Sequence, residues 1–536
     1  MVMNRDKRLD GNADDQSRGF AVRELLSPAA YPHAVSGLRL HETHLSWVIL
    51  TGDFAYKIKK AVHFEYIDTM SLARRLELCR EELRLNARLA ADLYLDVVPI
   101  TRDSGGLRIK GSGTVVDYAV CMRQFDSSQE LRALLASGDI DVREITALAE
   151  RIARFHGDAA IAPPSQFFEY TGQMRDAMLG TLSALRSHAV DAAAPAELER
   201  LSDWAAQFLH AASERLHLRE QTACVRECHG DLHAGNIVRW RGVLTPFDCL
   251  EFDPKLRFID VLNDVAFLVM DLMSHGRDDL GVTFLNRYLE CTGDYSGMPL
   301  ISFYAVYRAV VRAMVDALAI ENAARSAPQL RERLRARMRT ARELTERTAP
   351  LLLLMHGPSG SGKSHFSERL IGPLAAVRVR SDVERKRIGH NDHRVANTGY
   401  RQGLYEPGLT NRAYARLLEC AQQCIAGGFN TIIDAAFLSH STRSAFLDLA
   451  ASSGIQCVIL DCKADDWVLE HRLKQRAQDR RDVSDAGPEV LRRQLRDQEP
   501  LSDSERASCI EVATSATSAL SETLAAIRAV RRPAGV

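Results

Sequence analysis

The stretch Gly357-Pro358-Ser359-Gly360-Ser361-Gly362-Lys363-Ser364 decides the fold of the second half of this chain. It has the spacing G-x-x-x-x-G-K-S, in which the glycines let backbone N–H groups turn toward phosphate oxygens. An apolar run at 351–355 predicts a buried strand before it, and 365–370 can continue as a helix. Lys363 is expected to reach the β- and γ-phosphates, and the Ser364 hydroxyl to bind Mg²⁺. The pattern therefore predicts a nucleoside triphosphate site.

Three further short apolar runs follow this loop, at 376–380, 431–433 and 456–460, with helical patterns between them. This order predicts a doubly wound α/β domain with a parallel sheet and a site at the carboxyl ends of its strands. Asp382 and Asp434 would project there, and Asp434 would hold Mg²⁺ directly or through water. Alanine rather than glutamate follows Asp434, which favours phosphoryl transfer to a bound acceptor over motor-type hydrolysis.

Basic residues recur every four positions further along, at Arg472, Arg476 and Arg480. On a helix they would share one face, which could close over a nucleotide and neutralise the transferring phosphoryl group. The alternative is a solvated basic helix. The stretch from 351 to about 498 resembles small P-loop kinases of the gluconate-kinase, shikimate-kinase and zeta-toxin type. This resemblance implies that Asp382 is the acid or base on the substrate side.

The first half opens with alternating segments that predict two strands, 45–50 and 54–59, around a Gly-containing turn. A helical pattern at 71–91 and further strands at 95–101 and 115–124 follow. Lys57 lies on the second strand, and either Glu81 or Glu82 on the helix could pair with it. This order of elements is that of the smaller lobe of a kinase.

A second motif is His229-Gly230-Asp231-Leu232-His233-Ala234-Gly235-Asn236. Asp231 and Asn236 are separated by the Asp-to-Asn interval of a kinase catalytic loop, and a predicted hairpin then ends at Asp248. Asp231 can accept the proton of an attacking hydroxyl, while Asn236 and Asp248 can converge on Mg²⁺. Glu251 and Asp253 follow and could help to hold metal or substrate.

These residues resemble the aminoglycoside phosphotransferase and choline-kinase group of the protein-kinase-like fold, over roughly 38–320. The resemblance implies that Asp231 is the catalytic base. It implies Mg²⁺ ligands at Asn236 and Asp248, a phosphate-binding Lys57 with Glu82 as its expected partner, and a hinge beside the adenine at 122–125, beginning with Met122. The sequence departs from the group at 41–46, where His-Glu-Thr-His-Leu-Ser stands in place of a glycine-rich loop.

Composition sets limits on the partners of this chain. Its 536 residues require two or three domains, and its net charge of −1 gives no long-range attraction to nucleic acid or to an anionic membrane. The eleven cysteines include no C-x-x-C pair and fit free thiols in a reducing compartment. The first 18 residues lack an apolar segment, and no run approaches the length of a membrane span. We therefore expect a cytoplasmic protein.

The order of the two halves resembles bacterial fusion proteins that join an aminoglycoside phosphotransferase-like domain to an AAA-type or zeta-toxin-like ATP-binding domain. The expected fold class is α/β and α+β, with a flexible lead-in at 1–37, a two-lobe kinase-like domain at 38–347 and a P-loop domain at 348–536. Neither the acceptors nor the oligomeric state follows from the sequence. The expected function is ATP- and Mg²⁺-dependent transfer of the γ-phosphate to small hydroxyl-bearing molecules by both domains. The alternative is an active P-loop kinase whose N-terminal half is a binding or regulatory module.

Overall fold

The computed structural model describes residues 22–43, 45–64, 67–163, 169–188, 195–321, 328–346, 349–391, 407–465, 467–469, 471–472 and 488–531. By compactness the chain divides into two units. The first comprises Met1–Ser187 and Ala205–Asp271, and the second His188–Trp204 and Leu272–Val536. This division differs from the boundary predicted at 348, so the domain limits stay a prediction.

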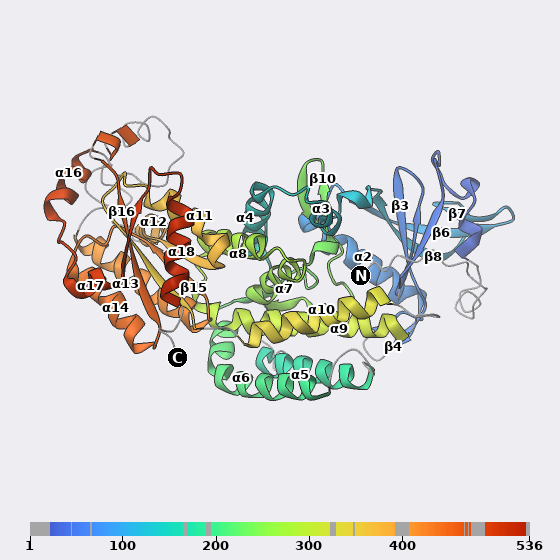
Figure 1. The fold of residues 1–536 in the computed structure, drawn as a ribbon. Helices are drawn as coiled ribbons and strands as arrows, with labels where there is room; N and C mark the ends of the chain where they lie inside the picture. The colour runs from blue at the N-terminus through green and yellow to red at the C-terminus, as the bar shows by residue number, and fades with distance from the viewer. Residues whose placement is uncertain are drawn as a thin grey trace. The chain divides into compact units, whose positions relative to one another are not determined.

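The first unit is built on a six-stranded antiparallel sheet (Figure 1) in the order β1-β2-β3-β8-β6-β7. Its strands are β1 Arg39–Glu42, β2 Ser46–Leu50, β3 Phe54–Lys59, β6 Tyr94–Asp103, β7 Gly106–Ile109 and β8 Thr114–Arg123. Tyr31, Trp47, Ile49 and Ile58 belong to a core on one face of this sheet. Residues alternate between the two faces of a strand, so Lys57 lies on the face opposite Ile58.

Helix α2, Leu72–Ala90, packs against β6 and β8, and its N-terminus is capped by the Ser71 hydroxyl. It follows a short hairpin of β4 His63–Phe64 and β5 Ile67–Asp68. The order of strands and helix is that of a kinase N-lobe, as predicted. The structure thus confirms the kinase-like fold class from topology alone.

The catalytic-loop motif lies among short antiparallel strand pairs and helices further along the chain. The hairpin pairs β10 Ile237–Trp240 with β11 Val243–Pro246. The flanking strands β9 Val225–Glu227 and β12 Phe258–Asp260 pair with each other antiparallel. The helices of this part of the chain are α3 Leu131–Ser137, α4 Val142–Asp158, α5 Tyr170–His188, α6 Pro195–Gln221 and α7 Val261–Ser274.

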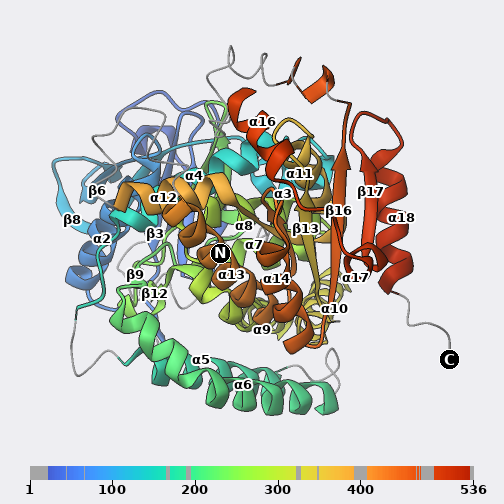
Figure 2. The ribbon, with the colours of Figure 1, turned by 90° about the vertical axis from the view of Figure 1, so that its left-hand side faces the viewer.

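The second unit contains a five-stranded parallel sheet in the order β14-β15-β13-β16-β17, which confirms the predicted sheet type. The strands are β13 Leu351–His356, β14 Ala376–Arg380, β15 Asn430–Asp434, β16 Gln456–Lys463 and β17 Cys509–Ala513. The helices around it are α11 Lys363–Leu374, α12 Ser381–Asn391, α13 Pro407–Ala426, α14 His440–Ser452, α16 Pro488–Asp497, α17 Asp503–Ala507 and α18 Ala519–Arg531. Figure 2 shows β17 between β16 and α18. Leu353 and Met355 of β13 share a buried core with Phe366 of α11 and Ile527 of α18.

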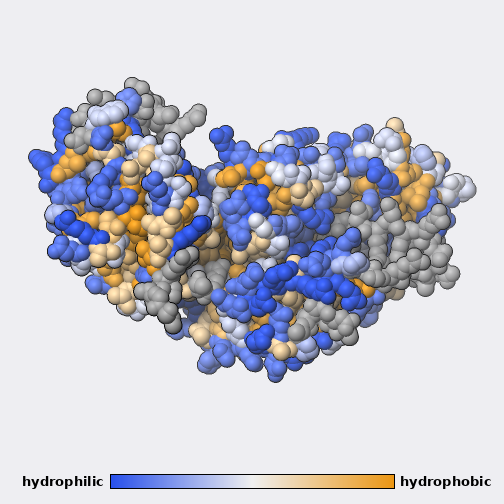
Figure 3. Space-filling model, viewed as in Figure 1, coloured by the Kyte–Doolittle hydropathy of each residue, from blue (hydrophilic) through white to orange (hydrophobic). Residues whose placement is uncertain are grey.

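Three helices that precede the P-loop also belong to the second unit: α8 Asp278–Thr292, α9 Met298–Glu321 and α10 Pro328–Thr345. On α10, Leu334, Met338 and Ala341 are buried, as the sequence pattern predicted. Arg335, Arg339 and Arg342 are exposed, and Figure 3 shows a hydrophilic surface over this helix. Arg335 and Arg339 pair with Glu332 of the same helix, and Arg342 pairs with Glu346 just after its end, which fits a solvated face.

None of the helices that the structure describes is both long enough and apolar enough to cross a membrane.

Candidate active sites

Lys57 in the first unit lies between two carboxylates. Its ammonium is 2.8 Å from Glu82 and 2.5 Å from Asp248. The geometry decides between the two glutamates of α2, because Glu82 is fully buried beside the lysine while Glu81 pairs with Arg84 and Arg257. Burial opposes the charge of Lys57, but these two carboxylates outweigh it and hold its pKa well above the ordinary value.

A second lysine, which the sequence analysis did not single out, shares the same glutamate. Lys59 lies two residues further along β3, on the same face as Lys57, and donates to the other oxygen of Glu82 at 2.7 Å. Lys59 also bonds to Glu251. The predicted metal or substrate carboxylate at position 251 is therefore part of a largely buried row of alternating charges.

The catalytic-loop motif brings Asp231 and Asn236 together. The Asn236 amide donates to the Asp231 carboxylate at 2.8 Å and to the Asp231 carbonyl at 3.1 Å. Buried His229 bonds through Nε2 to the Phe247 carbonyl at 3.0 Å and through Nδ1 to the Asp231 N–H at 3.3 Å. Burial lowers the pKa of His229, so the neutral ring with a proton on Nε2 satisfies both bonds.

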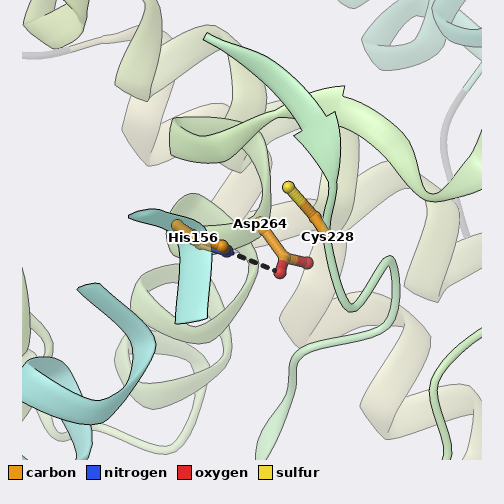
Figure 4. Close-up of side chains that lie close together, drawn as sticks. All are labelled: His156, Cys228 and Asp264. Carbon is orange, nitrogen blue, oxygen red and sulfur yellow. Dashed lines mark hydrogen bonds and ion pairs between the residues drawn. The ribbon is translucent and has the colours of Figure 1, made fainter. Parts of the chain in front are cut away.

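Asp264 of α7 anchors the backbone of this loop. Its two oxygens accept the backbone N–H groups of His229 and Gly230, each at 3.0 Å. His156 and Cys228 lie beside Asp264, and Figure 4 shows the His156 ring directed at the carboxylate, 3.2 Å away. These three residue types can bind metals, but here the Asp264 oxygens are used by the loop. Asp264 is thus structural in role.

Asp248 stands at the start of the next loop, with a left-handed φ of 64°. Its backbone N–H donates to the Tyr94 hydroxyl at 3.2 Å. Burial works against its charge, but Lys57 more than compensates and keeps the pKa of Asp248 below its ordinary value. The carboxylate is therefore ionised and faces the lysine, as metal and phosphate binding by this pair would require.

The predicted hinge begins at Met122, next to the end of β8. Met122 is partly buried and packs against a buried cluster that includes Phe247, and Phe125 packs edge-on against Phe247 with 5.1 Å between ring centroids. Where a glycine-rich loop would lie, the turn between β1 and β2 is closed by Thr43. Its N–H and hydroxyl both donate to the Ser46 carbonyl, at 2.8 and 2.9 Å.

In the second unit the P-loop joins β13 to α11, as its sequence predicted. Gly357, Gly360 and Gly362 all have φ between 88° and 129°, which favours glycine. A Cβ on Gly357 would lie 2.7 Å from the Cys462 carbonyl oxygen. The Lys363 ammonium lies against the loop, 2.7 Å from the carbonyls of Gly357 and Pro358.

The metal-binding residues predicted for this unit also meet. The Ser364 hydroxyl donates to Asp434 at 3.3 Å, and Asp434 is buried at the end of β15. Ser367, one turn along α11, donates to the other Asp434 oxygen at 3.2 Å. Ser367 was not predicted from the sequence, although an i, i+3 spacing from Ser364 places it on the same helix face.

Two further predicted residues have different outcomes. Asp382 lies in the first turn of α12 and is 3.7 Å from Arg385. Arg476 lies outside the described residues. Arg472 is described, and it donates to the Gly360 carbonyl at 3.2 Å and to the Thr514 hydroxyl at 3.3 Å. It thus lies at the P-loop, as a phosphate-side arginine would.

Comparisons with known proteins found matches to each half of the chain separately. A family model described as "AAA domain" matches residues 352–501. Among solved structures, a choline/ethanolamine kinase family protein from Mesorhizobium loti is 15% identical with a TM-score of 0.36, covering 62% of this chain and 94% of that chain. A gluconokinase from Sinorhizobium meliloti 1021 is 18% identical with a TM-score of 0.24, covering 34% of this chain and 95% of that chain.

A match to "Uncharacterized protein Rv2004c" of Mycobacterium tuberculosis strain H37Rv spans both halves. The two chains are 30% identical over 443 residues, which is 82% of this chain and 86% of that protein. This chain, in which a protein-kinase-like fold precedes a P-loop kinase-like fold, belongs to the family that includes Rv2004c.

Proposed function

We propose that this protein is a bifunctional ATP-dependent phosphotransferase whose two halves each transfer the γ-phosphate to a small acceptor bearing a hydroxyl group. The observation that carries the proposal is the grouping of Asp231 with Asn236 on an anchored loop, together with Asp248 opposite Lys57. A protein that only bound a ligand would have no use for a carboxylate held in the position of a catalytic base.

In the first half, Asp231 would accept the proton from the acceptor hydroxyl as that oxygen attacks the γ-phosphorus. Asn236 and Asp248 offer the oxygen donors that Mg²⁺ prefers, so they fit this ion. Bound Mg²⁺ would neutralise charge on the phosphates. Lys57 would exchange its bond to Asp248 for the nucleotide phosphates, while Glu82 keeps the ammonium in place.

In the second half, the glycines of the P-loop would present backbone N–H groups to the phosphates, and Lys363 would leave its loop carbonyls for them. Ser364 and Asp434 supply hard oxygen donors that fit Mg²⁺. Arg472, on the Gly360 carbonyl, would stabilise the charge on the phosphate groups. Asp382 remains the proposed acid or base toward the acceptor.

One observation favours a second candidate for the first half, a ligand-binding or regulatory module. The turn of the β1–β2 hairpin contains no glycine, and Thr43 ties it to Ser46 through two hydrogen bonds. A turn closed in this way offers fewer backbone N–H groups to a nucleotide than a glycine-rich loop does. In this alternative only the P-loop half transfers phosphate.

The test compares the wild type with Asp231→Ala and Lys363→Ala in nucleotide binding and in ATP turnover with Mg²⁺. Sugars, amino alcohols and nucleosides serve as acceptors. Asp139→Ala and Lys463→Ala, at exposed positions in the same two units, are the matched controls. We expect each of the first two substitutions to remove a separate part of the turnover.

The outcomes separate the candidates. If Lys363→Ala removes all turnover and Asp231→Ala none, the first half is a module. If neither substitution changes turnover beyond its control, the proposed phosphotransferase activity is wrong.

A further inference from the structure

The edge of the P-loop sheet is held by a helix that precedes the P-loop by about 70 residues. β14 is the outermost strand on its side, and Asn286 of α8 bonds to its backbone twice. The Asn286 amide donates to the Ala376 carbonyl at 2.9 Å, and its oxygen accepts the Arg378 N–H at 2.7 Å. Asn286 therefore pairs with β14 much as another strand would, and α8 is fixed to the site.

One helical turn after Asn286, Glu290 meets a buried arginine of that strand. Arg378 is 6% exposed, and its guanidinium lies 3.2 Å from the Glu290 carboxylate. A second nitrogen of Arg378 donates to the Ser364 carbonyl at 3.1 Å and to the Ser367 hydroxyl at 3.3 Å. The guanidinium thus joins Glu290 to the first turn of the P-loop helix.

Hydrogen bonds from this helix turn reach Asp434, the carboxylate proposed to bind Mg²⁺. Ser364 and Ser367 each donate a hydroxyl bond to Asp434, at 3.3 and 3.2 Å. Arg380 lies between the two acids, 4.0 Å from Asp434 and 4.0 Å from Glu290. Glu290 also pairs at 3.2 Å with Arg287 of α8, whose side chain is 37% exposed. Apart from this more solvated arginine, two arginines and two carboxylates are gathered at the proposed Mg²⁺ site of this half.

The charges of Arg378, Arg380 and Asp434 indicate a role for Glu290. With Glu290 present, each arginine has a carboxylate, and Asp434 can turn its charge to a metal ion. Without it, Asp434 would be left to balance Arg380, and Arg378 would lose its carboxylate beside Ser364 and Ser367. Both positive charges would then oppose a divalent cation in a poorly solvated site.

We propose that Glu290 is a positioning residue for the P-loop half, which keeps Asp434 available for Mg²⁺ by neutralising Arg378 and Arg380. This inference rests on the proposed function of that half. It also places a residue needed by the P-loop site well before the predicted boundary at 348.

The experiment measures binding of a fluorescent ADP analogue to the full chain as a function of Mg²⁺ concentration. All variants carry Asp248→Asn, which removes the metal carboxylate of the other half. Glu290→Gln is compared with Glu332→Gln, an exposed glutamate of α10 in the same unit. Removing a group that supports a metal ligand lowers metal affinity by about 10–100-fold.

We expect Glu290→Gln to raise the Mg²⁺ concentration at half-saturation by about tenfold or more, the lower end of that range. Nucleotide binding in EDTA should not weaken, because the site has gained positive charge. Adding Arg380→Gln should bring the Mg²⁺ midpoint back toward that of the control, which a merely structural role for Glu290 would not produce.

An unchanged Mg²⁺ midpoint in folded Glu290→Gln would overturn the inference. If that variant does not fold, Arg380→Gln alone decides, since it should lower the midpoint; a rise or no change would contradict the charge balance. The proposed function fails separately, if Lys363→Ala leaves nucleotide binding in the Asp248→Asn background intact.

Discussion

Replacing Glu82 by glutamine should destabilise the first unit more than any neighbouring charge change on α2. Glu82 is fully buried, and its two oxygens bond one lysine each, the partly buried Lys57 and the buried Lys59. Removing one partner of a buried ion pair costs about 3–5 kcal/mol, and the lower end applies here because Lys57 keeps Asp248 and Lys59 keeps Glu251. In a unit of about 250 residues this corresponds to a fall in Tm of at least about 6 °C.

Glu81→Gln is the matched control. Glu81 is the preceding residue of the same helix, and it pairs with Arg84 at a partly exposed position. It also pairs with buried Arg257, which keeps Glu227 as a second carboxylate. Exposed pairs contribute about 1 kcal/mol or less, so its Tm should change by only a few degrees. Differential scanning calorimetry gives the Tm, and hydrogen exchange of peptides from β3 and α2 assigns the loss to the first unit.

The effect should also depend on pH with a defined sign. Burial opposes the charge of Glu82, but the two lysines prevail and lower its pKa from about 4.5. A carboxylate with a lowered folded pKa stabilises the fold above the unfolded pKa and loses this contribution as pH falls through the folded value. The difference between wild type and Glu82→Gln should therefore shrink below about pH 4.5. A Tm within 1–2 °C of the Glu81→Gln control at neutral pH would refute the reasoning.

Three further predictions concern other parts of the chain. Burial opposes the charge of Glu505, but the fully buried Arg443 helps to lower its pKa to about 2. The stability of the second unit should therefore fall as pH is lowered from about 4.5 to about 2, and in acid unfolding experiments the stability of Glu505→Gln should depend less on pH in this range. Asp264→Ala should lower turnover by the first half and speed hydrogen exchange of the loop at 229–236, because two backbone N–H groups lose their acceptor; unchanged exchange would contradict this. Gly360→Ala should weaken nucleotide binding by about 5–100-fold through backbone strain, because the φ of Gly360 is 88° and a Cβ there would lie 2.9 Å from a carbonyl oxygen. The control Gly408→Ala, at a position with open space around the added Cβ, should bind nucleotide normally in the same titration.

Much of the fold could be predicted from sequence because its signals are local. The P-loop, the His-Gly-Asp motif and the alternating strand at 54–59 each specify a backbone conformation through neighbouring residues, and each lies where it was predicted. The fifth parallel strand, β17, was missed. It lies at the edge of its sheet, so only part of its surface is buried and its sequence lacks the continuous apolar run of a central strand.

Which side chains lie in contact could be predicted less well from the sequence. The choice of Glu82 over Glu81 depends on the rotation of α2 about its axis relative to β3, which packing determines and adjacent residues cannot reveal. Lys59 was not singled out from the sequence, and the structure places it, 3% exposed, between Glu82 and Glu251.

The sequence by itself determined which groups are available for binding phosphate and metal: the lysines, the glycines, and the acids that follow strands. Tertiary structure alone decided which of them act together, as with Glu290, which lies on α8 yet reaches the P-loop helix through Arg378. The physical reason is that spacing along the chain fixes only local geometry. Contacts between distant segments follow from how sheets and helices bury their apolar faces, and buried charges must then find partners wherever that packing brings them.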